Sequence, residues 1–337
     1  MSPQISVIIP AYNAERTILE TIASAQQQTF SDFELIVIND GSTDGTLELL
    51  NSVEDPRLKI FSYSNGGLPV ARNRGISQAS GEFITFLDAD DLWTPDKLEA
   101  QVAALQQHPE AGLAYSWTYF MDDKGESFHT SNTVTFEGNV YSNLLLGNFL
   151  ESGSNPLIRR QAIDTVGEFD STLKYCEDWE YWLRLAARWP FVVVPKQQIF
   201  YRQTSGAMSS NIEVAEKYHL IFIERAFQSA PLESRSLKNQ SLANIYEFLA
   251  QLYLTRLPGV SGAKLARQKL QTAIAMYPQI LFKKKTQSLV FKLVLIRVLS
   301  PNIASNLLQF ISKIRATRIK NSHNDKALLS KDNFSAL

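Results

Sequence analysis

Short apolar runs alternate with amphipathic segments over the first third of the chain. Apolar runs rich in β-branched residues predict strands, and apolar residues that recur every three or four positions predict helices. The predicted strands are 5–9, which Pro10 is expected to end, 33–38, 58–63 and 83–87; the predicted helices are 14–28, a segment ending at Leu50, and 71–80. Such alternation is typical of a mostly parallel sheet with helices on both faces, so the sequence predicts an α/β fold.

The rest of the chain has a different pattern. The predicted elements are a helix at 95–107, a strand-like stretch at 112–120, a hairpin turn at 122–125, a helix at 177–188 that Pro190 ends, a strand at 191–194, and helices at 213–228, 237–254 and 263–277. Residues 126–160 carry no pattern that orders them. We therefore predict three parts, namely an α/β domain at 1–210, a helical region at 211–322 and a polar tail at 323–337.

Composition narrows the class of protein. The chain has 337 residues, 45% of them apolar, which is enough to bury a sizeable core. A net charge of −1 argues against binding of nucleic acid through bulk charge. The one cysteine, Cys176, excludes an internal disulfide and a cysteine-based zinc site, and it favours a reducing compartment. The sequence shows neither a secretory-signal pattern nor an apolar run long enough to span a bilayer, so we expect a cytoplasmic location.

An acidic cluster follows the fourth predicted strand. Asp88, Asp90 and Asp91 come directly after the apolar run 83–87. One interpretation is a metal site, because Mg²⁺-type cations prefer one or two carboxylates together with substrate phosphates. The other is a polar turn before a helix that begins at Thr94-Pro95. The cluster alone leaves both interpretations open.

Three polar segments follow predicted parallel strands and are expected to meet at one edge of the sheet. They are 10–13, 39–42 and 88–90. Open α/β sheets bind ligands at that edge, where Asp40 could accept hydrogen bonds from a base or a ribose. Each segment alone is more typical of a turn, and their joint placement favours a binding site. The absence of phosphate-loop and dinucleotide fingerprints weakens an ATPase or dehydrogenase interpretation.

Four segments together resemble the family 2 glycosyltransferases. They are Val7–Asn13, Ile38–Thr46, Pro69–Gly75 and Phe86–Asp91, in that family's order and approximate spacing. With two further segments below, the resemblance covers roughly residues 5–205. It implies a GT-A fold and transfer of a sugar from a nucleoside diphosphate, with inversion at the anomeric carbon.

The resemblance also implies donor-side roles. Asp40 corresponds to the carboxylate that contacts the nucleobase, commonly uracil, and Arg72 to a basic residue near the nucleotide. Asp88, Ala89 and Asp90 form the D-x-D element, in which Asp90 would contact Mn²⁺ or Mg²⁺ and Asp88 would face the ribose or the metal. The wall of the nucleoside pocket would be built by Pro10, Ala11, Tyr12 and Asn13.

A further segment, Tyr175–Arg184, resembles the family's acceptor-side E-D element. Here Glu177 and Asp178 are the two acidic residues, and Asp178 would be the general base. Inversion requires a base that deprotonates the acceptor hydroxyl on the face opposite the leaving diphosphate. The alternative for Asp178 is a role in capping the helix that begins here.

The last matching segment, Tyr201–Ser209, departs from the family pattern. Arg202 would contact the diphosphate, but Thr204 stands where the family often has histidine and Ala207 where it often has serine. The Q-x-x-R-W element of processive polymerases is also missing, because Leu185 replaces its glutamine. A single-addition enzyme is therefore favoured over a polysaccharide synthase.

The segment 283–320 is basic and contains no acidic residue. Apolar residues interleave with its lysines and arginines, which predicts basic amphipathic helices broken near Pro301. Such helices can lie on an anionic membrane, or they can dock on the protein with their basic edge in water. A lipid-linked acceptor would give the membrane interpretation a function, as a peripheral protein on the inner face of the plasma membrane.

These observations predict a metal-dependent inverting glycosyltransferase. The expected donor is a UDP-sugar, and the expected acceptor is a glycan or lipid-linked intermediate of cell-surface polysaccharide synthesis. Two alternatives remain, a non-catalytic module that binds nucleotide sugars and a nucleotidyltransferase. The first would show no turnover, and the second would consume a nucleoside triphosphate and release pyrophosphate.

Overall fold

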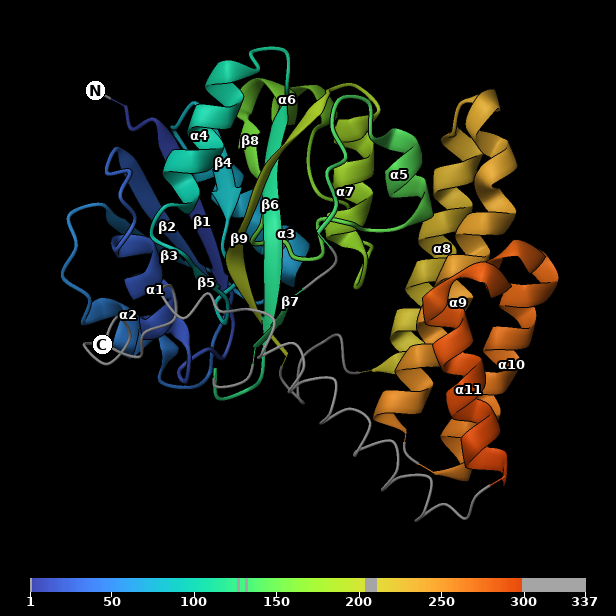
Figure 1. Cartoon of the computed structure of the whole chain (residues 1–337). Helices are drawn as coiled ribbons and strands as arrows, with labels where there is room; N and C mark the ends of the chain where they lie inside the picture. Colours follow the sequence, from blue (N-terminus) through green and yellow to red (C-terminus); the bar gives the residue numbers. More distant parts are fainter. Residues whose placement is uncertain (1, 126–127, 131–132, 204–210, 258, 299–337) are drawn as a thin grey trace, which may run out of the picture. The chain divides into compact units, whose positions relative to one another are not determined.

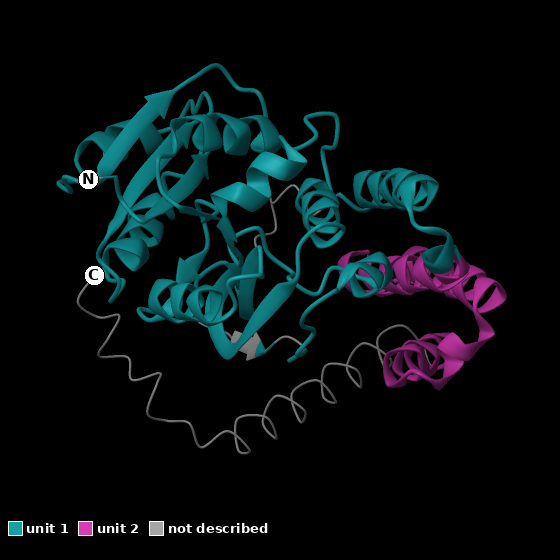
Figure 2. Cartoon of the chain, turned by 90° about the horizontal axis from the view of Figure 1, so that it is seen from above, with its two compact units in different colours: residues 1–235 teal, residues 236–337 magenta. Residues whose placement is uncertain are grey.

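The computed structural model describes residues 2–125, 128–130, 133–203, 211–257 and 259–298. The chain forms two compact units, residues 1–235 and 236–337 (Figure 2). The first unit is an α/β structure and the described part of the second is helical.

The first four strands form the parallel half of the sheet. They are β1 (Ile5–Ala11), β2 (Phe33–Asn39), β3 (Leu58–Ser62) and β4 (Phe83–Phe86), in the order β3-β2-β1-β4 (Figure 1). The connecting helices are α1 (Ile18–Gln26), α2 (Thr46–Asn51) and α3 (Leu68–Gln78). Every residue of β1 and β2 is buried, as expected of strands covered on both faces. The predicted alternation is confirmed.

The two faces of β1 contact different helices. Val7 and Ile9 share a core with Ile18 of α1 and Leu98 of α4 (Lys97–Gln107). Ile8 points the other way, toward α3, where a Cβ added at Gly75 would lie 2.2 Å from the Ile8 Cγ2 atom. A glycine is therefore required for α3 to approach the sheet this closely.

β1 extends beyond Pro10, which the sequence analysis expected to end it. Pro10 pairs with Ile38 and Ala11 with Asn39 in the parallel register with β2. The carbonyl of Ile8 accepts from Leu87 on the β4 side, and residues two apart in a strand point the same way. Pro10 therefore points past the end of β4, where no N–H is needed for pairing.

The other half of the sheet is mixed. β4 pairs antiparallel with β8 (Leu157–Arg159), β8 antiparallel with β6 (Leu113–Met121), and β6 parallel with β9 (Phe191–Arg202). β5 (Leu92–Trp93) and β7 (Phe128–Thr130) pair with β9 and β6, and the β6–β7 pair forms the hairpin predicted at 122–125. The remaining helices are α5 (Tyr141–Leu146), α6 (Arg160–Val166), α7 (Glu177–Ala186) and α8 (Ile212–Ser229).

Helix α8 belongs to the first unit, although the domain boundary predicted from the sequence precedes it. The reason is aromatic packing. Trp179 of α7 lies against Phe222 of α8, with ring centroids 4.8 Å apart, and against His219, at 5.9 Å.

The second unit is described through α9 (Lys238–Arg256), α10 (Val260–Met276), the 3-10 helix η3 (Pro278–Phe282) and α11 (Lys284–Val298). Another 3-10 helix, η2 (Leu232–Leu237), precedes α9. Ala243, Ala273 and Ile280 form a small hydrophobic cluster in the second unit. Among the described residues of the whole chain, no helix is both long enough and apolar enough to cross a membrane.

Glu34 fastens the turn before β4 to the sheet. Its buried carboxylate accepts from the Ser6 hydroxyl, from the backbone N–H and hydroxyl of Ser80, and from Lys59, all at 2.7–2.8 Å. Burial alone would raise its pKa. The hydrogen bonds from Lys59, Ser6 and Ser80 together outweigh burial and lower the pKa from 4.5 to about 2.

Because this pKa is lowered on folding, Glu34 stabilises the protein above pH 4.5, and the contribution is lost as the pH falls toward about 2. We expect Glu34→Gln to lower the free energy of unfolding by about 2 kcal/mol at neutral pH and by clearly less near about pH 3. Urea denaturation at both pH values checks this, with Glu54→Gln at an exposed site as the control. An undiminished difference at low pH would contradict the assigned role.

Candidate active site

The carboxyl ends of β1, β2 and β4 lie at one edge of the sheet. In the parallel register Ala11 is opposite Asn39, and Ile8 is opposite Phe86. The residues that follow these strands therefore emerge side by side. The structure thus places Asn13, Asp40 and Asp88 at the edge where the sequence analysis expected them.

The segment after β1 is tied to the segment after β2. Asn13 has a left-handed backbone with φ 50°. Its N–H donates to the Ser42 hydroxyl at 3.0 Å, and its Oδ1 accepts from the Thr43 N–H at 2.8 Å. Pro10 and Ala11 are buried in β1, whereas 53% of Tyr12 is exposed. This geometry leaves the Tyr12 ring available at the rim.

Asp40 is buried beneath the start of α3. Its carboxylate accepts from the N–H groups of Gly66 at 3.0 Å and Gly67 at 2.8 Å, and from Arg74 Nη1 at 2.6 Å. A negative charge is favourable there because the amino end of a helix carries partial positive charge. The sequence analysis missed Arg74, although it lies in the segment 69–75 that carries the family resemblance.

Arg72 points into the protein and joins two distant acidic residues. Its Nη2 donates to Asp88 Oδ1 at 2.9 Å and its Nη1 to Glu177 Oε1 at 3.0 Å, and only 1% of the residue is exposed. Phe86 and Phe169 flank the guanidinium, with ring centroids 5.8 and 5.5 Å from its central carbon. Burial opposes the charge, but the neighbouring carboxylates outweigh burial and raise the pKa of Arg72. The D-x-D and E-D elements are thereby brought into one site.

Gly153 leaves the space that this arginine needs. A Cβ added there would lie 2.2 Å from Arg72 Nη2 and 3.3 Å from Asp88 Oδ2. The first distance is well below any normal contact, so even alanine would displace the guanidinium. Gly153 belongs to the segment 147–156, in which the sequence analysis found no pattern.

Asp91, the third acidic residue of the cluster, has an internal role. It is fully buried, and its Oδ2 accepts from the hydroxyls of Ser152 at 3.0 Å and Ser154 at 2.6 Å. Its Oδ1 accepts from the Arg202 N–H at 3.0 Å. Asp91 therefore joins the segment 147–156 to the end of β9, whereas Asp88 and Asp90 are only half-buried.

Asp88 and Asp90 are suited to bind a divalent cation, whose coordination shell substrate phosphates would complete. Burial first, and the negative charge of Asp88 second, raise the pKa of Asp90 to about 6. A cation would relieve this repulsion between oxygen donors that Mg²⁺ and Mn²⁺ prefer. Within the described residues, no three His, Cys, Asp or Glu side chains are grouped to hold a metal. One or two carboxylates together with substrate phosphates are the usual ligands of Mg²⁺ in such sites.

Arg202 is placed beneath the D-x-D element. Its guanidinium donates to the carbonyls of Asp90 at 2.9 Å and Asp123 at 3.2 Å, and to Glu20 Oε2 at 2.7 Å. These bonds support the backbone of Asp90. Contact of Arg202 with a diphosphate stays a prediction, and Thr204 and Ala207 lie outside the described residues.

The E-D element begins α7. Cys176 is the N-cap and has a left-handed backbone with φ 63°. Glu177 is paired with Arg72, and its pKa is raised to about 7 by burial first and by the charge of Asp178 second. Asp178 Oδ1 accepts from the Trp179 N–H at 2.6 Å, and its Oδ2 lies 3.5 Å from Asn148 Nδ2. The pKa of Asp178 is raised, chiefly by burial. Because Cys176 is the N-cap, Asp178 lies in the first turn of α7 and is not the capping residue.

The segment 147–156 contacts each part of the site, and the sequence analysis did not find it. Asn148 faces Asp178, Gly153 faces Arg72, and Ser152 and Ser154 hold Asp91. Glu151 in this segment has φ 67°. In the part of the chain that the structure describes, the non-glycine residues with positive φ are Asn13, Glu151 and Cys176, all in segments of this site. Strained backbone of this kind clusters at functional sites.

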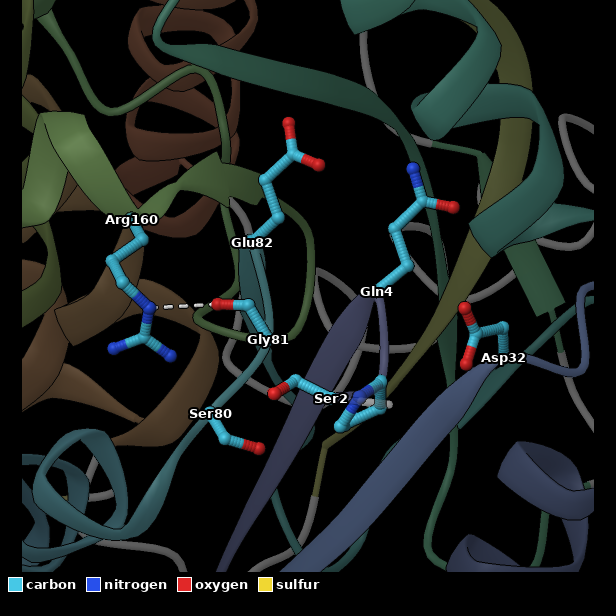
Figure 3. Close-up of a pocket in the computed structure, with 8 residues that line it drawn as sticks. Ser2, Gln4, Asp32, Ser80, Gly81, Glu82 and Arg160 are labelled. Carbon is cyan, nitrogen blue, oxygen red and sulfur yellow. Dashed lines mark hydrogen bonds between the residues drawn. The ribbon is translucent and has the colours of Figure 1, made fainter.

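A shallow hollow lies elsewhere, at the amino ends of β1, β2 and β4 (Figure 3). Gln4, Asp32, Glu82 and Arg160 are among the residues that line it, and Arg160 Nε donates to the Gly81 carbonyl at 2.7 Å. It is at the opposite end of the parallel strands from Asp88. The hollow is lined by side chains of both charges, and none of Asp88, Asp90 and Asp91 lines it.

Residues 6–251 match the family model described as glycosyltransferase like family 2. The chain belongs to this family. The resemblance carried by the four sequence segments is thereby confirmed, and with it the prediction that the protein is a glycosyltransferase.

Relatives support the assignment. An uncharacterized glycosyltransferase of Rickettsia typhi is 29% identical over 255 residues, which cover 73% of this chain and 80% of that protein. The putative teichuronic acid biosynthesis glycosyltransferase TuaG of Bacillus subtilis is 34% identical over 154 residues, covering 43% of this chain and 60% of TuaG. For some other relatives the match covers as little as 21% of their length.

Solved structures show the fold. S. aureus TarS 1–349 in complex with UDP-GlcNAc has a TM-score of 0.54 at 21% identity, over 83% of this chain and 91% of that one. The mannosyltransferase PcManGT of Pyrobaculum calidifontis, in complex with GDP-Man and Mn²⁺, has a TM-score of 0.58 at 17% identity, over 97% and 88%. The predicted GT-A fold with a helical carboxyl-terminal region is confirmed.

Removing the guanidinium would leave Asp88 and Glu177 without their shared counter-charge. We expect Arg72→Met to lower the free energy of unfolding by about 3 kcal/mol or more, because a partnerless buried charge is costly. Adding Glu177→Gln should recover part of this loss. Denaturant unfolding checks both variants, with Lys196→Met in the exposed pair with Asp96 as the control, expected to cost less than about 1 kcal/mol. Equal effects of Arg72→Met and Lys196→Met would contradict the bridging role.

Proposed function

We propose that this protein is a metal-dependent inverting glycosyltransferase that uses a UDP-sugar. The acceptor is a glycan or lipid-linked intermediate of cell-surface polysaccharide synthesis. The observation that carries the proposal is the Arg72 bridge, which joins the D-x-D carboxylate Asp88 to the E-D residue Glu177. Donor-side and acceptor-side groups then act on one sugar.

On the donor side, Asp88 and Asp90 are the metal ligands. When bound there, Mn²⁺ or Mg²⁺ supplies charge neutralisation for the leaving diphosphate. Arg202 keeps the Asp90 backbone in place through the 2.9 Å bond to its carbonyl, and Arg72 fixes one oxygen of Asp88. The protein's own contribution is therefore to hold two carboxylates in a fixed orientation.

On the acceptor side, Asp178 accepts the proton of the attacking hydroxyl. Burial raises its pKa, which makes the carboxylate a stronger base, while the nearby charge of Arg72 opposes this rise. Its Oδ1 is engaged by the Trp179 N–H, so Oδ2 is the oxygen that would take the proton. Asn148, whose own Oδ1 accepts from the Leu150 N–H at 3.2 Å, presents its Nδ2 toward that oxygen.

The nucleobase is assigned to the region around Asp40. Its carboxylate is oriented by Gly66, Gly67 and Arg74, and the exposed Tyr12 ring lies after β1 at the same edge. A uracil N3–H group donates, which a carboxylate accepts. UDP as the nucleotide is supported by the TarS complex with UDP-GlcNAc, while PcManGT is seen with GDP-Man.

A role at the cell surface is supported by the relative TuaG, whose name refers to teichuronic acid biosynthesis. A lipid-linked acceptor would place the enzyme in the cytoplasm, as a peripheral protein on the inner face of the plasma membrane. The segment proposed to meet that anionic surface is 283–320, of which residues 299–320 lie outside the described part.

Calorimetric titration of UDP with and without Mn²⁺ tests the donor site. We expect wild-type protein to bind UDP more tightly with Mn²⁺, and Asp90→Ala to abolish the metal-dependent part because a metal ligand is lost. Asp32→Ala, an exposed carboxylate at the opposite edge of the sheet, is the matched control and should bind as the wild type does. Metal-independent binding in all three proteins would count against the proposed metal site.

Substitution of the base separates turnover from binding. We expect Asp178→Asn to slow sugar transfer, and hydrolysis of the donor, by about 10²–10⁴-fold while UDP binding with Mn²⁺ is retained. Glu180→Gln, in the same helical turn and paired with Arg184, is the control and should keep activity.

The same assay distinguishes the alternatives. A non-catalytic binding module would bind UDP, show no turnover and be indifferent to Asp178→Asn. A nucleotidyltransferase would consume a nucleoside triphosphate and release pyrophosphate. Either outcome would overturn the proposed function.

A further inference from the structure

Helix α11 carries large apolar side chains that are exposed to solvent. Phe291 is 55% exposed, Val294 52% and Val298 74%, and Phe282 just before the helix is 83% exposed. Exposed apolar residues are ordinary when scattered, but a group on one element marks an interaction surface.

The three helical residues lie on one face. At about 100° per residue, Phe291, Val294 and Val298 fall within about 60° of one another around the helix axis. We call these three residues the α11 stripe. Of the buried residues of α11, Leu289 lies about 170° from the middle of the stripe, and Thr286, about 110° from it, donates to Glu247 of α9. The stripe is therefore the outward face of a helix whose inner face is already packed.

Basic residues border the stripe. By the same rotation, Lys292 lies about 100° to one side of Phe291 and Arg297 about 120° to the other, with Lys284 nearly in line toward the amino end. From Pro278 to Val298 the chain carries Lys283, Lys284, Lys285, Lys292 and Arg297, and no acidic residue. Long basic side chains in this position can extend their charge away from an apolar surface on which their stems rest.

We propose that the α11 stripe binds the surface of an anionic lipid bilayer. An apolar strip bordered by cations suits the boundary between acyl chains and negatively charged headgroups. A second copy of this chain is a poorer occupant, because the same face would bring like charges together. Nucleic acid is poorer still, because the apolar residues lie at the centre of the face.

This inference deepens the proposed function, which supplies a reason for the enzyme to be at a membrane. It assigns the lipid contact to described residues rather than to the basic segment as a whole. Helix α11 would lie on the bilayer rather than cross it.

Co-sedimentation with vesicles tests the proposal on the full chain at physiological salt. The vesicles contain phosphatidylcholine alone or mixed with phosphatidylglycerol. We expect wild-type protein to bind the anionic vesicles preferentially and Phe291→Ser/Val294→Ser/Val298→Ser to lose at least about tenfold in partitioning. The matched control is Leu232→Ser/Val260→Ser, which removes apolar residues that are 77% and 71% exposed elsewhere. Wild type that ignores anionic vesicles, or a triple variant that binds as well as the control, would overturn it.

The charge of the border is tested separately. Lys292→Gln/Arg297→Gln should weaken binding to anionic vesicles, whereas Lys264→Gln/Arg267→Gln, an equal charge change at exposed positions of α10, should not. Equal losses would mean that net charge alone governs binding, against the proposed surface.

A fluorescent probe reports contact without depending on stability. Cys176 is buried and is the chain's one cysteine, so Val294→Cys can be labelled selectively with an environment-sensitive dye. We expect a blue shift on anionic vesicles for Val294→Cys and none for Lys264→Cys. A dye at position 294 that is already in an apolar setting without vesicles would show that the face is covered within the protein, and would overturn the proposal. Donor hydrolysis in solution by the triple serine variant separates failure of this surface from failure of the proposed function.

Discussion

A buried guanidinium between two carboxylates holds this site together. Arg72 lies on α3, Asp88 follows β4 and Glu177 begins α7, so the one side chain fixes three elements relative to one another. Since a charge at 1% exposure is costly unless opposite charges lie beside it, the surrounding structure must keep both carboxylates in place. Donor-side and acceptor-side chemistry therefore share a single electrostatic anchor.

The loops around this anchor are shaped to accommodate it. Gly153 leaves room for Arg72, and Asp91 holds the neighbouring serines on one side and the end of β9 on the other. The acidic cluster is thus divided between structure and chemistry. Asp91 is satisfied internally, while Asp88 and Asp90 keep the repulsion that a cation would relieve. Asp40 likewise has a structural role, because its carboxylate accepts from the N–H groups of Gly66 and Gly67 before α3. It also lies at the position proposed to contact a nucleobase.

The parallel half of the sheet was predictable because the patterns that indicate its strands and helices are local in sequence. Parallel strands have their carboxyl ends at one edge of the sheet, so the predicted strand ends already place Asp40 and Asp88 at that edge. What could not be predicted depends on contacts between distant segments. Pro10 stays in β1 only because β4 is shorter on that side, and α8 belongs to the first unit through Trp179 and Phe222. The segment 147–156 has no periodic pattern, and its importance appears only once Arg72 and Asp178 are seen beside it. The hydrogen bonds from Arg202 to the Asp90 carbonyl and to Glu20 could not be predicted from the sequence either.

The central claim is that the D-x-D and E-D elements form one site around Arg72. A crystal structure of the protein with UDP and Mn²⁺ tests it most directly. The account predicts the metal between the diphosphate and the carboxylates of Asp88 and Asp90, uracil beside Asp40, and Arg72 still paired with Glu177, so that Asp178 faces the position of the donor sugar. Nucleotide bound elsewhere, or a complex in which Glu177 and Asp178 lie away from the diphosphate, would contradict it.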